Sequence, residues 1–241
     1  MNAHALFVAD VHLCESRPEA SARFFDFLRN TAAEAQSLYI LGDLFESWVG
    51  DDDLAAPLHQ AVIKQLSDLS ARDVNIYFMH GNRDFMLARH FAQLCGMHLL
   101  SDPVVVDLYG TPTLLTHGDT LCTADVDYQR YRRVIRHPGM LKLLRALPLK
   151  LRQRMAQRAR ADSERAKTHK SATIMDVDPH AVMALFQQHR VRRMIHGHTH
   201  RPAQHRINIE GAVYERWVLP DWYGENGGYI ACDAKSCRLV M

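Results

Sequence analysis

The stretch VNIYFMHGNRDF (residues 74–85) begins as a short apolar run and ends abruptly in polar side chains. The apolar part, 74–79, has the length and composition of a buried strand. His80, Asn82 and Asp84 follow it at once, and Gly81 among them allows the chain to leave a strand sharply. Because ligands of open α/β sheets bind beyond the carboxyl ends of strands, this pattern predicts a functional site at the end of the strand.

The same arrangement recurs at four other places in the chain. Apolar runs at 6–9, 38–41, 113–116 and 193–195 each lead directly into residue types that bind metals. These residues are Asp10 and His12, Asp43, His117 and Asp119, and His196, His198 and His200. A single Gly-Asp pair is usually a turn, and a single histidine after a strand is usually structural. Five such strand ends in order predict side chains that converge on one place.

Helix-like segments separate these runs and set the expected fold class. They cover 19–35, 55–71 and 85–95. Strands that alternate with helices predict a largely parallel, layered α/β core. After residue 202 the pattern changes to short runs at 204–209, 213–219, 228–233 and 237–240, separated by glycine and asparagine, which predicts an antiparallel ending.

The composition excludes several classes of protein. Of the 241 residues, 47% are hydrophobic and 23% are charged, which rules out disordered, collagen-like and coiled-coil chains. No apolar run approaches the ~18 residues of a membrane-spanning helix, and the N-terminus lacks the pattern of a signal peptide. The five cysteines are odd in number and contain no C-x-x-C pair. We therefore expect neither a disulfide framework nor a thiolate zinc site, and a reducing cytosol fits best.

One segment carries most of the positive charge. Fourteen lysines and arginines lie between Arg130 and Lys170 against two acidic residues, a net charge of +12, whereas the remainder of the chain has −10. The segment has helical texture at 128–137 and 140–147, and Pro148 is expected to end one helix and begin the next. An apolar stripe runs beside the cations at Leu141, Leu144, Leu147, Leu151 and Met155. We interpret about 125–172 as a helical insertion that meets an anionic partner; a solvated amphipathic surface is the plainer alternative.

Taken together, the strand-end motifs resemble the signature of the calcineurin-like metallophosphoesterase family. Asp-x-His, Gly-Asp, Gly-Asn-Arg-Asp, His and Gly-His-x-His occur in that order within residues 5–202. Longer stretches resemble one subfamily, the UDP-2,3-diacylglucosamine pyrophosphohydrolases of lipid A biosynthesis. They are ILGDLFESWVGDDD (40–53), HGNRDF (80–85), THGD (116–119), IMDV (174–177) and HGHTHRP (196–202). The resemblance implies one metallophosphoesterase domain over 1–241, a layered αββα sandwich with a helical lid at about 125–172.

The resemblance also implies two manganese ions held by the strand-end residues. Asp10, His12, Asp43 and His200 would bind the first ion, and Asp43, Asn82, His117 and His198 would bind the second. Nitrogen and oxygen ligands without thiolate suit manganese better than a structural zinc. Paired metals lower the pKa of bound water and clamp the attacking and leaving oxygens. The implied catalytic residues are Asp43, Asn82, Arg83 and His117.

The implied reaction is attack of a metal-bound hydroxide on the α-phosphorus of UDP-2,3-diacylglucosamine. The products would be UMP and 2,3-diacylglucosamine 1-phosphate (lipid X). The substrate-binding residues implied by motif position are Asn82, Arg83, Asp125, Ser163, Lys167, Lys170 and His198. At position 167 the better-known members carry asparagine, and Lys167 has donors but no acceptor, so it keeps that role only in part or is a solvated helix cation. His80, Asp84 and His196 are expected to support the ligands.

Three other functions remain as alternatives. A nuclease would use the basic segment to follow a phosphate backbone, but few aromatic residues accompany the cations, so nucleic acid is not the expected partner. A phosphoprotein or cyclic-nucleotide phosphatase is disfavoured by the 40–53 stretch, and a metal-free binding scaffold by the complete set of ligand residues. We expect a cytoplasmic enzyme, peripheral on the anionic cytoplasmic face of the inner membrane, without an obligate protein partner.

Overall fold

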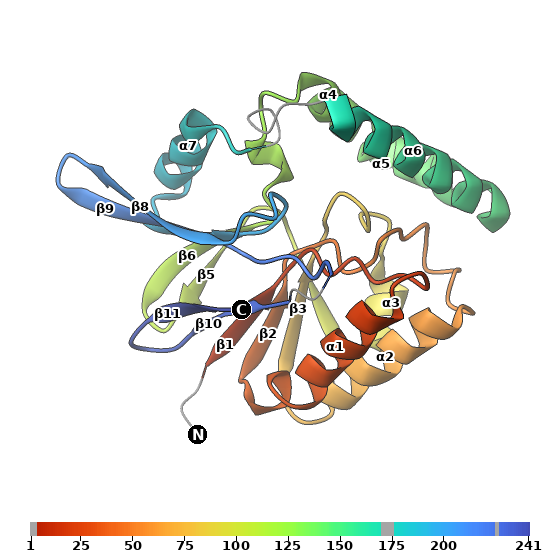
Figure 1. The fold of residues 1–241 in the computed structure, drawn as a ribbon, viewed down its shortest axis with the longest axis horizontal. Helices are drawn as coiled ribbons and strands as arrows, with labels where there is room; N and C mark the ends of the chain where they lie inside the picture. Colours follow the sequence, from red (N-terminus) through yellow and green to blue (C-terminus); the bar gives the residue numbers. More distant parts are fainter. Residues whose placement is uncertain (1–3, 170–175, 225–226) are drawn as a thin grey trace.

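Two β-sheets pack face to face between layers of helices in the computed structural model, which describes residues 4–169, 176–224 and 227–241 (Figure 1). The first sheet has the strand order β11-β10-β1-β2-β3-β4 and the second has the order β5-β6-β7-β9-β8. Helices α1, α2 and α3 cover the outer face of the first sheet, and α7 covers the second (Figure 1). The layers are therefore αββα, and the predicted fold class is confirmed.

The bounds of the elements follow the predicted runs closely. The strands are β1 (Ala5–Val8), β2 (Ser37–Ile40), β3 (Asn75–Met79), β4 (Met97–Leu100), β5 (Val104–Leu108), β6 (Thr111–Thr116), β7 (Arg193–His196), β8 (Ala203–Ile209), β9 (Ala212–Val218), β10 (Tyr229–Cys232) and β11 (Cys237–Val240). The helices are α1 (Pro18–Arg29), α2 (Pro57–Ser70), α3 (Arg89–Leu94), α4 (Val126–Ile135), α5 (Pro138–Ala146), α6 (Leu149–His169) and α7 (Pro179–His189), with short 3-10 turns at Ala32–Glu34 and Asp119–Leu121. Helix α5 ends before Pro148 and α6 begins after it, as expected.

Successive residues of the central strands enter different cores. On β1, Leu6 and Val8 join the cluster that packs against α1–α3, whereas Phe7 joins the cluster between the sheets with Leu115 and Ile195. Leu6, Phe7 and Val8 are each at most 1% exposed. Burial on both faces explains why these strands read as continuous apolar runs in the sequence.

Parallel pairing brings the carboxyl ends of the key strands to one edge. β1, β2 and β3 pair in parallel in the first sheet, and β6, β7 and β9 pair in parallel in the second. The expected antiparallel ending is right for β8–β9, β1–β10 and β10–β11 but wrong for β9 against β7. Strands β4 and β5 and helix α7 were not expected, because short or mixed-polarity segments give weak periodicity.

Two of the five cysteines form a disulfide, contrary to the expectation from their number and spacing. Cys232 and Cys237 lie opposite each other in the β10–β11 pair and are bonded. Their separation of five residues in the sequence did not indicate a disulfide, because only the register of the β10–β11 hairpin brings the two cysteines together.

The basic segment forms α4, α5 and α6 beyond the carboxyl ends of the strands (Figure 1). The apolar stripe divides: Leu144 is buried in the core against α1–α3, whereas Leu151 and Met155 are each 43% exposed. Arg152 of α6 is 4% exposed and donates to the backbone oxygen of Leu147 at 3.0 Å. Among the described helices, none combines the length and the apolar character needed to cross a membrane.

Phe78 offers a test of the core between β3 and the helices. Its side chain is fully buried, so Phe78→Ala should lower the free energy of unfolding by about 3–5 kcal/mol through lost burial and a cavity. Urea denaturation measures this change. Val105→Ala, at a residue 39% exposed on β5, is the control and should cost less than about 1 kcal/mol; equal losses would contradict the assignment of the core.

Candidate active site

Backbone hydrogen bonds carry the ends of β1, β2, β6 and β7 into one set of adjoining loops. The backbone N–H of Asp10 donates to the oxygen of Gly42 at 3.1 Å, and that of His12 donates to the oxygen of Asp43 at 2.9 Å. Gly197 donates in the same way to the oxygen of His117 at 3.0 Å, across the second sheet. The polar residues after each strand are therefore held by backbone as well as by side chains.

Five of the predicted residues adopt a left-handed backbone conformation. Asp10, His12, Asp43 and His200 have φ of 54°, and His198 has φ of 70°. This region is uncommon for residues other than glycine, and such conformations concentrate at functional sites. The motifs in the sequence do not reveal this backbone conformation, because none of the five residues is glycine.

Two glycines allow the carboxylates to approach the neighbouring backbone. A Cβ atom on Gly81 would overlap the carboxylate of Asp43, and one on Gly197 would overlap that of Asp10. Glycine is required at both positions by close approach rather than by its own dihedral angles. The two motifs that supply these glycines therefore also shape the space in which the carboxylates lie.

All seven predicted metal ligands lie in one connected group, which we call the strand-end cluster. Its members are Asp10, His12, Asp43, Asn82, His117, His198 and His200. The Nε2 atom of His12 lies 3.8 Å from carboxylate oxygens of both Asp10 and Asp43, and Nε2 of His117 lies 3.9 Å from Asp43.

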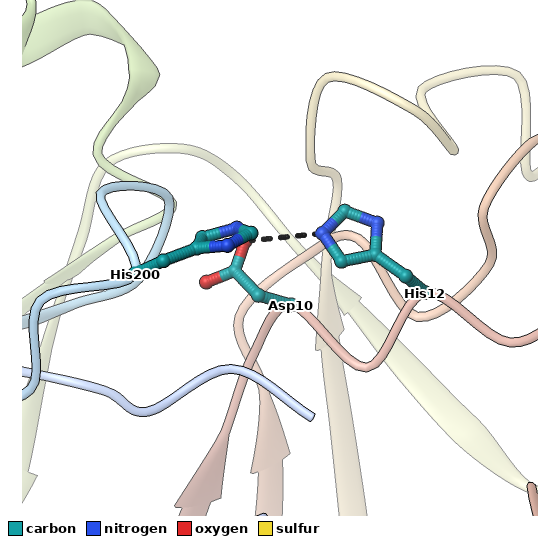
Figure 2. Close-up of side chains that lie close together, drawn as sticks. All are labelled: Asp10, His12 and His200. Carbon is teal, nitrogen blue, oxygen red and sulfur yellow. Dashed lines mark ion pairs between the residues drawn. The ribbon is translucent and has the colours of Figure 1, made fainter. Parts of the chain in front are cut away.

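The amide of Asn82 joins the second half of the cluster. Its Oδ1 lies 3.0 Å from Nε2 of His117 and 3.0 Å from Nδ1 of His198. His200 completes the first half, with Nε2 at 3.4 Å from Oδ1 of Asp10. Figure 2 shows the His12 and His200 rings approaching the Asp10 carboxylate from opposite sides.

Burial controls the charge of this cluster. It raises the pKa of Asp43 to about 7, and it lowers the pKa of His198 to about 3 and that of His12 well below its usual range. Burial also opposes the charged form of His200, but the neighbouring carboxylates of Asp10 and Asp221 raise its pKa to about 10. Neutral imidazoles beside carboxylates are the forms that bind cations.

The chemistry of the cluster fits a divalent metal. Two groups, Asp10–His12–His200 and Asp10–Asp43–His117, each offer ligand atoms within 4.8 Å of one another. Oδ1 of Asp10 and Nε2 of His12 are buried and have no hydrogen-bond partner in the part of the chain that the structure describes. Buried polar atoms without partners are costly, and a cation between them would satisfy both.

The expected supporting residues orient the strand ends. The Asp84 carboxylate accepts hydrogen bonds from the backbone N–H groups of Gly81 at 2.8 Å and Leu44 at 2.7 Å. His80 lies 2.7 Å from the backbone oxygen of Leu87 and His196 lies 2.8 Å from that of Gly197. Through these contacts Asp84, His80 and His196 fix the loops that follow β2, β3 and β7.

The predicted substrate-binding residues are not all part of the cluster. The backbone N–H of Arg83 donates to Oδ1 of Asp43 at 2.9 Å, so Arg83 lies beside it. Asp125 begins α4 and accepts from the backbone N–H of Tyr128 at 3.2 Å, and Ser163 is exposed on α6. Lys170 lies outside the described residues; Lys167 is within α6, but its side chain is not described.

Several residues at the site carried no recognisable sequence signal. Asp221 contacts Nδ1 of His200 at 3.1 Å, and the Tyr223 ring lies beside that of His12, tilted by 46° with ring centroids 5.2 Å apart. Buried Asp119 accepts hydrogen bonds from Tyr128 of α4 at 2.5 Å and from Arg132 at 2.6 Å. The contacts of Asp221 and Tyr223 arise only when the segment after β9 returns to the first sheet. Only Asp119 was among the strand-end residues identified in the sequence, within the THGD motif, but its contacts with α4 were not expected.

Comparison with known proteins agrees with this arrangement. Residues 3–202 match the model of the calcineurin-like phosphoesterase family. The chain belongs to the calcineurin-like phosphoesterase family. The family resemblance found in the sequence is thereby confirmed.

Relatives of this phosphoesterase share nearly its whole length. It is 48% identical over 234 residues to a UDP-2,3-diacylglucosamine hydrolase of Aeromonas salmonicida (strain A449), covering 97% of this chain and 91% of the relative. It is 49% identical over 217 residues to a protein of the same name from Marinobacter nauticus, covering 90% and 88%. The structure of Vacuolar Protein Sorting 29 from Cryptosporidium parvum shares the fold, with a TM-score of 0.52, 12% identity and coverage of 99% and 89%.

Metal binding should release protons from this phosphoesterase. Because the pKa of His200 is raised to about 10 and that of Asp43 to about 7, both groups hold protons that a metal must displace near neutral pH. Apparent affinity for a divalent cation should therefore rise with pH between about 6 and 9. Calorimetric titration in buffers of different ionisation enthalpy measures the protons released. His200→Ala should release fewer; a heat independent of buffer would contradict the prediction.

Proposed function

We propose that this phosphoesterase hydrolyses the pyrophosphate bond of UDP-2,3-diacylglucosamine, giving UMP and 2,3-diacylglucosamine 1-phosphate (lipid X), a step of lipid A biosynthesis. The observation that carries the proposal is identity of 48% across 97% of the chain with a relative named for that hydrolysis. The strand-end cluster supports it, because carboxylates, imidazoles and an amide at one place suit a metal-dependent phosphoester hydrolysis.

Two manganese ions are the proposed cofactors. Asp10, His12, Asp43 and His200 would hold one ion, and Asp43, Asn82, His117 and His198 would hold the other. The absence of cysteine from the cluster favours manganese over a structural zinc. When bound, the two ions would supply an activated water and electrostatic stabilisation of phosphate oxygens.

The protein's own residues prepare the site for that chemistry. The Nδ1 atom of His117 lies 2.8 Å from the backbone oxygen of Leu41, and donation there leaves Nε2 with a lone pair directed at the cluster. Oδ1 of Asn82 lies between the imidazoles of His117 and His198, where it would hold the same ion as they do. Arg83, beside Asp43, offers a planar fork of donors to the phosphate oxygens.

The helical segment α4–α6 is the proposed lid, with insertion limits of about 125–172. Asp125, Ser163, Lys167 and Lys170 would contact the sugar and phosphates, and His198 would touch a phosphate as well as its metal. Each buried methylene contributes ~0.8 kcal/mol, so the acyl chains would supply much of the affinity for substrate under this lid.

The lid is also the proposed contact with the membrane. Leu151 and Met155 are each 43% exposed, and they lie on the same helix as exposed cations such as Arg154 and Arg158. Apolar side chains beside cations favour an anionic bilayer surface. A peripheral position on the cytoplasmic face of the inner membrane would let a two-chain lipid reach the site without crossing water.

Purified protein incubated with manganese and UDP-2,3-diacylglucosamine should release UMP. Asp43→Ala should abolish manganese-dependent turnover, since it removes the ligand shared by both ions, while thermal melting shows that the fold is retained. The readouts are UMP release and metal content per chain. Near-normal turnover of Asp43→Ala with two bound ions would refute the shared ligand, and cleavage of DNA without release of UMP would favour a nuclease.

Binding to anionic vesicles should be strong at low salt and weak at high salt. Each cation near the surface contributes about 1 kcal/mol, which salt screens. Reversal of charge at exposed Arg154 and Arg158 should reduce flotation with vesicles and turnover of vesicle-borne substrate, but spare a soluble short-chain analogue. Arg152 lies on the same helix, but it is buried and cannot contact the vesicle surface, so it is not changed in this test. Absence of flotation at low salt would refute the membrane contact.

A further inference from the structure

Glu46, a buried carboxylate outside the cluster, joins three arginines from distant parts of the chain. It lies in the stretch 40–53 and is 9% exposed. Nη2 of Arg17, after β1, donates to its Oε2 at 2.6 Å, and Nη1 of Arg83, after β3, donates to its Oε1 at 2.7 Å. Arg160 of α6 forms an ion pair with the same Oε1. Two loops and the proposed lid therefore meet at one side chain.

Further contacts hold this carboxylate in place. The backbone N–H of Glu46 donates to the oxygen of Leu13 at 3.0 Å, and the hydroxyl of Tyr223 lies 3.3 Å from Oε2. The guanidinium carbon of Arg17 lies 4.3 Å from the centroid of the Tyr223 ring, a favourable cation–π position. Both carboxylate oxygens of Glu46 are therefore engaged by neighbouring side chains.

The network around Glu46 touches the strand-end cluster. Its Oε2 lies 3.8 Å from Nδ1 of His12, and Nε of Arg83 lies 3.8 Å from Oδ2 of Asp43. Arg17 Nη2 also donates to the backbone oxygen of His12 at 2.5 Å. Any shift of Glu46 would therefore move groups in direct contact with two cluster residues.

The charges of this network do not balance. One carboxylate meets three guanidinium groups, which leaves a formal surplus of +2 beside the cluster. Each guanidinium has five N–H donors in a planar fork, so Arg83 and Arg160 can remain bound to Glu46 and still offer donors to a phosphate. Without the carboxylate, the three cations would repel one another and their long side chains would lose a fixed position.

We propose that Glu46 is a positioning residue that holds Arg83 and Arg160 where they meet the diphosphate of the substrate. It thereby couples helix α6 to the strand-end cluster. The proposal rests on the proposed function for its substrate, but the geometry of Glu46 itself does not. A residue that merely stabilised the fold would change stability without affecting how the two arginines act on substrate.

Steady-state kinetics on the manganese-loaded enzyme tests the coupling. Glu46→Gln should lower kcat/KM for UDP-2,3-diacylglucosamine by about tenfold to hundredfold, mainly through a higher KM, with metal content unchanged. Glu46→Asp keeps the charge and should lose less. Combined with Arg83→Ala, the loss from Glu46→Gln should be smaller than in the wild type, because both changes act on one guanidinium.

Asp52→Asn is the matched control. It removes another carboxylate that pairs with an arginine of α6, Arg152, eight residues before Arg160. Its kcat/KM should stay within about twofold, since Asp52 is largely exposed and Arg152 keeps its hydrogen bonds to the backbone oxygens of Leu147 and Val49. Losses that multiply in the Glu46→Gln/Arg83→Ala double variant, or an equal loss in Asp52→Asn, would overturn the positioning role.

Hydrogen exchange provides a readout that needs no turnover. In the full-length protein, amides of α6 around Arg160 should exchange about tenfold faster in Glu46→Gln than in wild type, whereas Asp52→Asn should affect only those around Arg152. Unchanged exchange around Arg160 would overturn the link between Glu46 and α6. If wild type releases no UMP, the proposed function fails, and exchange still decides the role of Glu46.

Discussion

Burial of several carboxylates at one edge of the sandwich is the constraint on which the rest of the structure depends. Asp10, Asp43, Asp84 and Asp119 are each at most 2% exposed. Removing an ionised carboxylate from water costs several kcal/mol unless partners compensate. Backbone N–H groups compensate Asp84 and arginines compensate Asp119. Asp10 and Asp43 instead face imidazoles and each other, an arrangement that a bound cation would stabilise.

The same principle attaches the helical segment to the sandwich. Helix α4 is held at Asp119 by Arg132 and Arg136, and α6 is held at Glu46 by Arg160. Apolar packing contributes mainly through α5, where Leu144 is buried. Part of the positive charge of this segment therefore neutralises buried acids, while other cations, such as Arg154 and Arg158, are exposed on α6.

Local patterns in the sequence predicted a layered α/β core and the convergence of residues at the strand ends, whereas the αββα layers and the set of seven ligands were implied by the family resemblance. Runs such as 74–79 are largely apolar on both faces, and the metal-binding residue types that follow each run indicate where the site lies. Asp221, Tyr223 and Glu46 were not predicted. Their roles depend on contacts between segments far apart in the sequence, and the spacing of residues within one segment gives no information about such contacts. The left-handed backbone at Asp10 and His200 also has no local signal, because neither residue is glycine.

The position of β10 beside β1 has a consequence for how the protein is made. β1 is synthesised long before its antiparallel neighbour β10, which begins at Tyr229. The segment between β9 and β10 also supplies Asp221, which contacts His200. The edge of β1 that pairs with β10 therefore stays uncovered until β10 has been synthesised, and the site lacks Asp221 until the segment before β10 has been made. A chain that stalls before this point would have most of its sandwich but an exposed strand edge, which is the condition that favours aggregation.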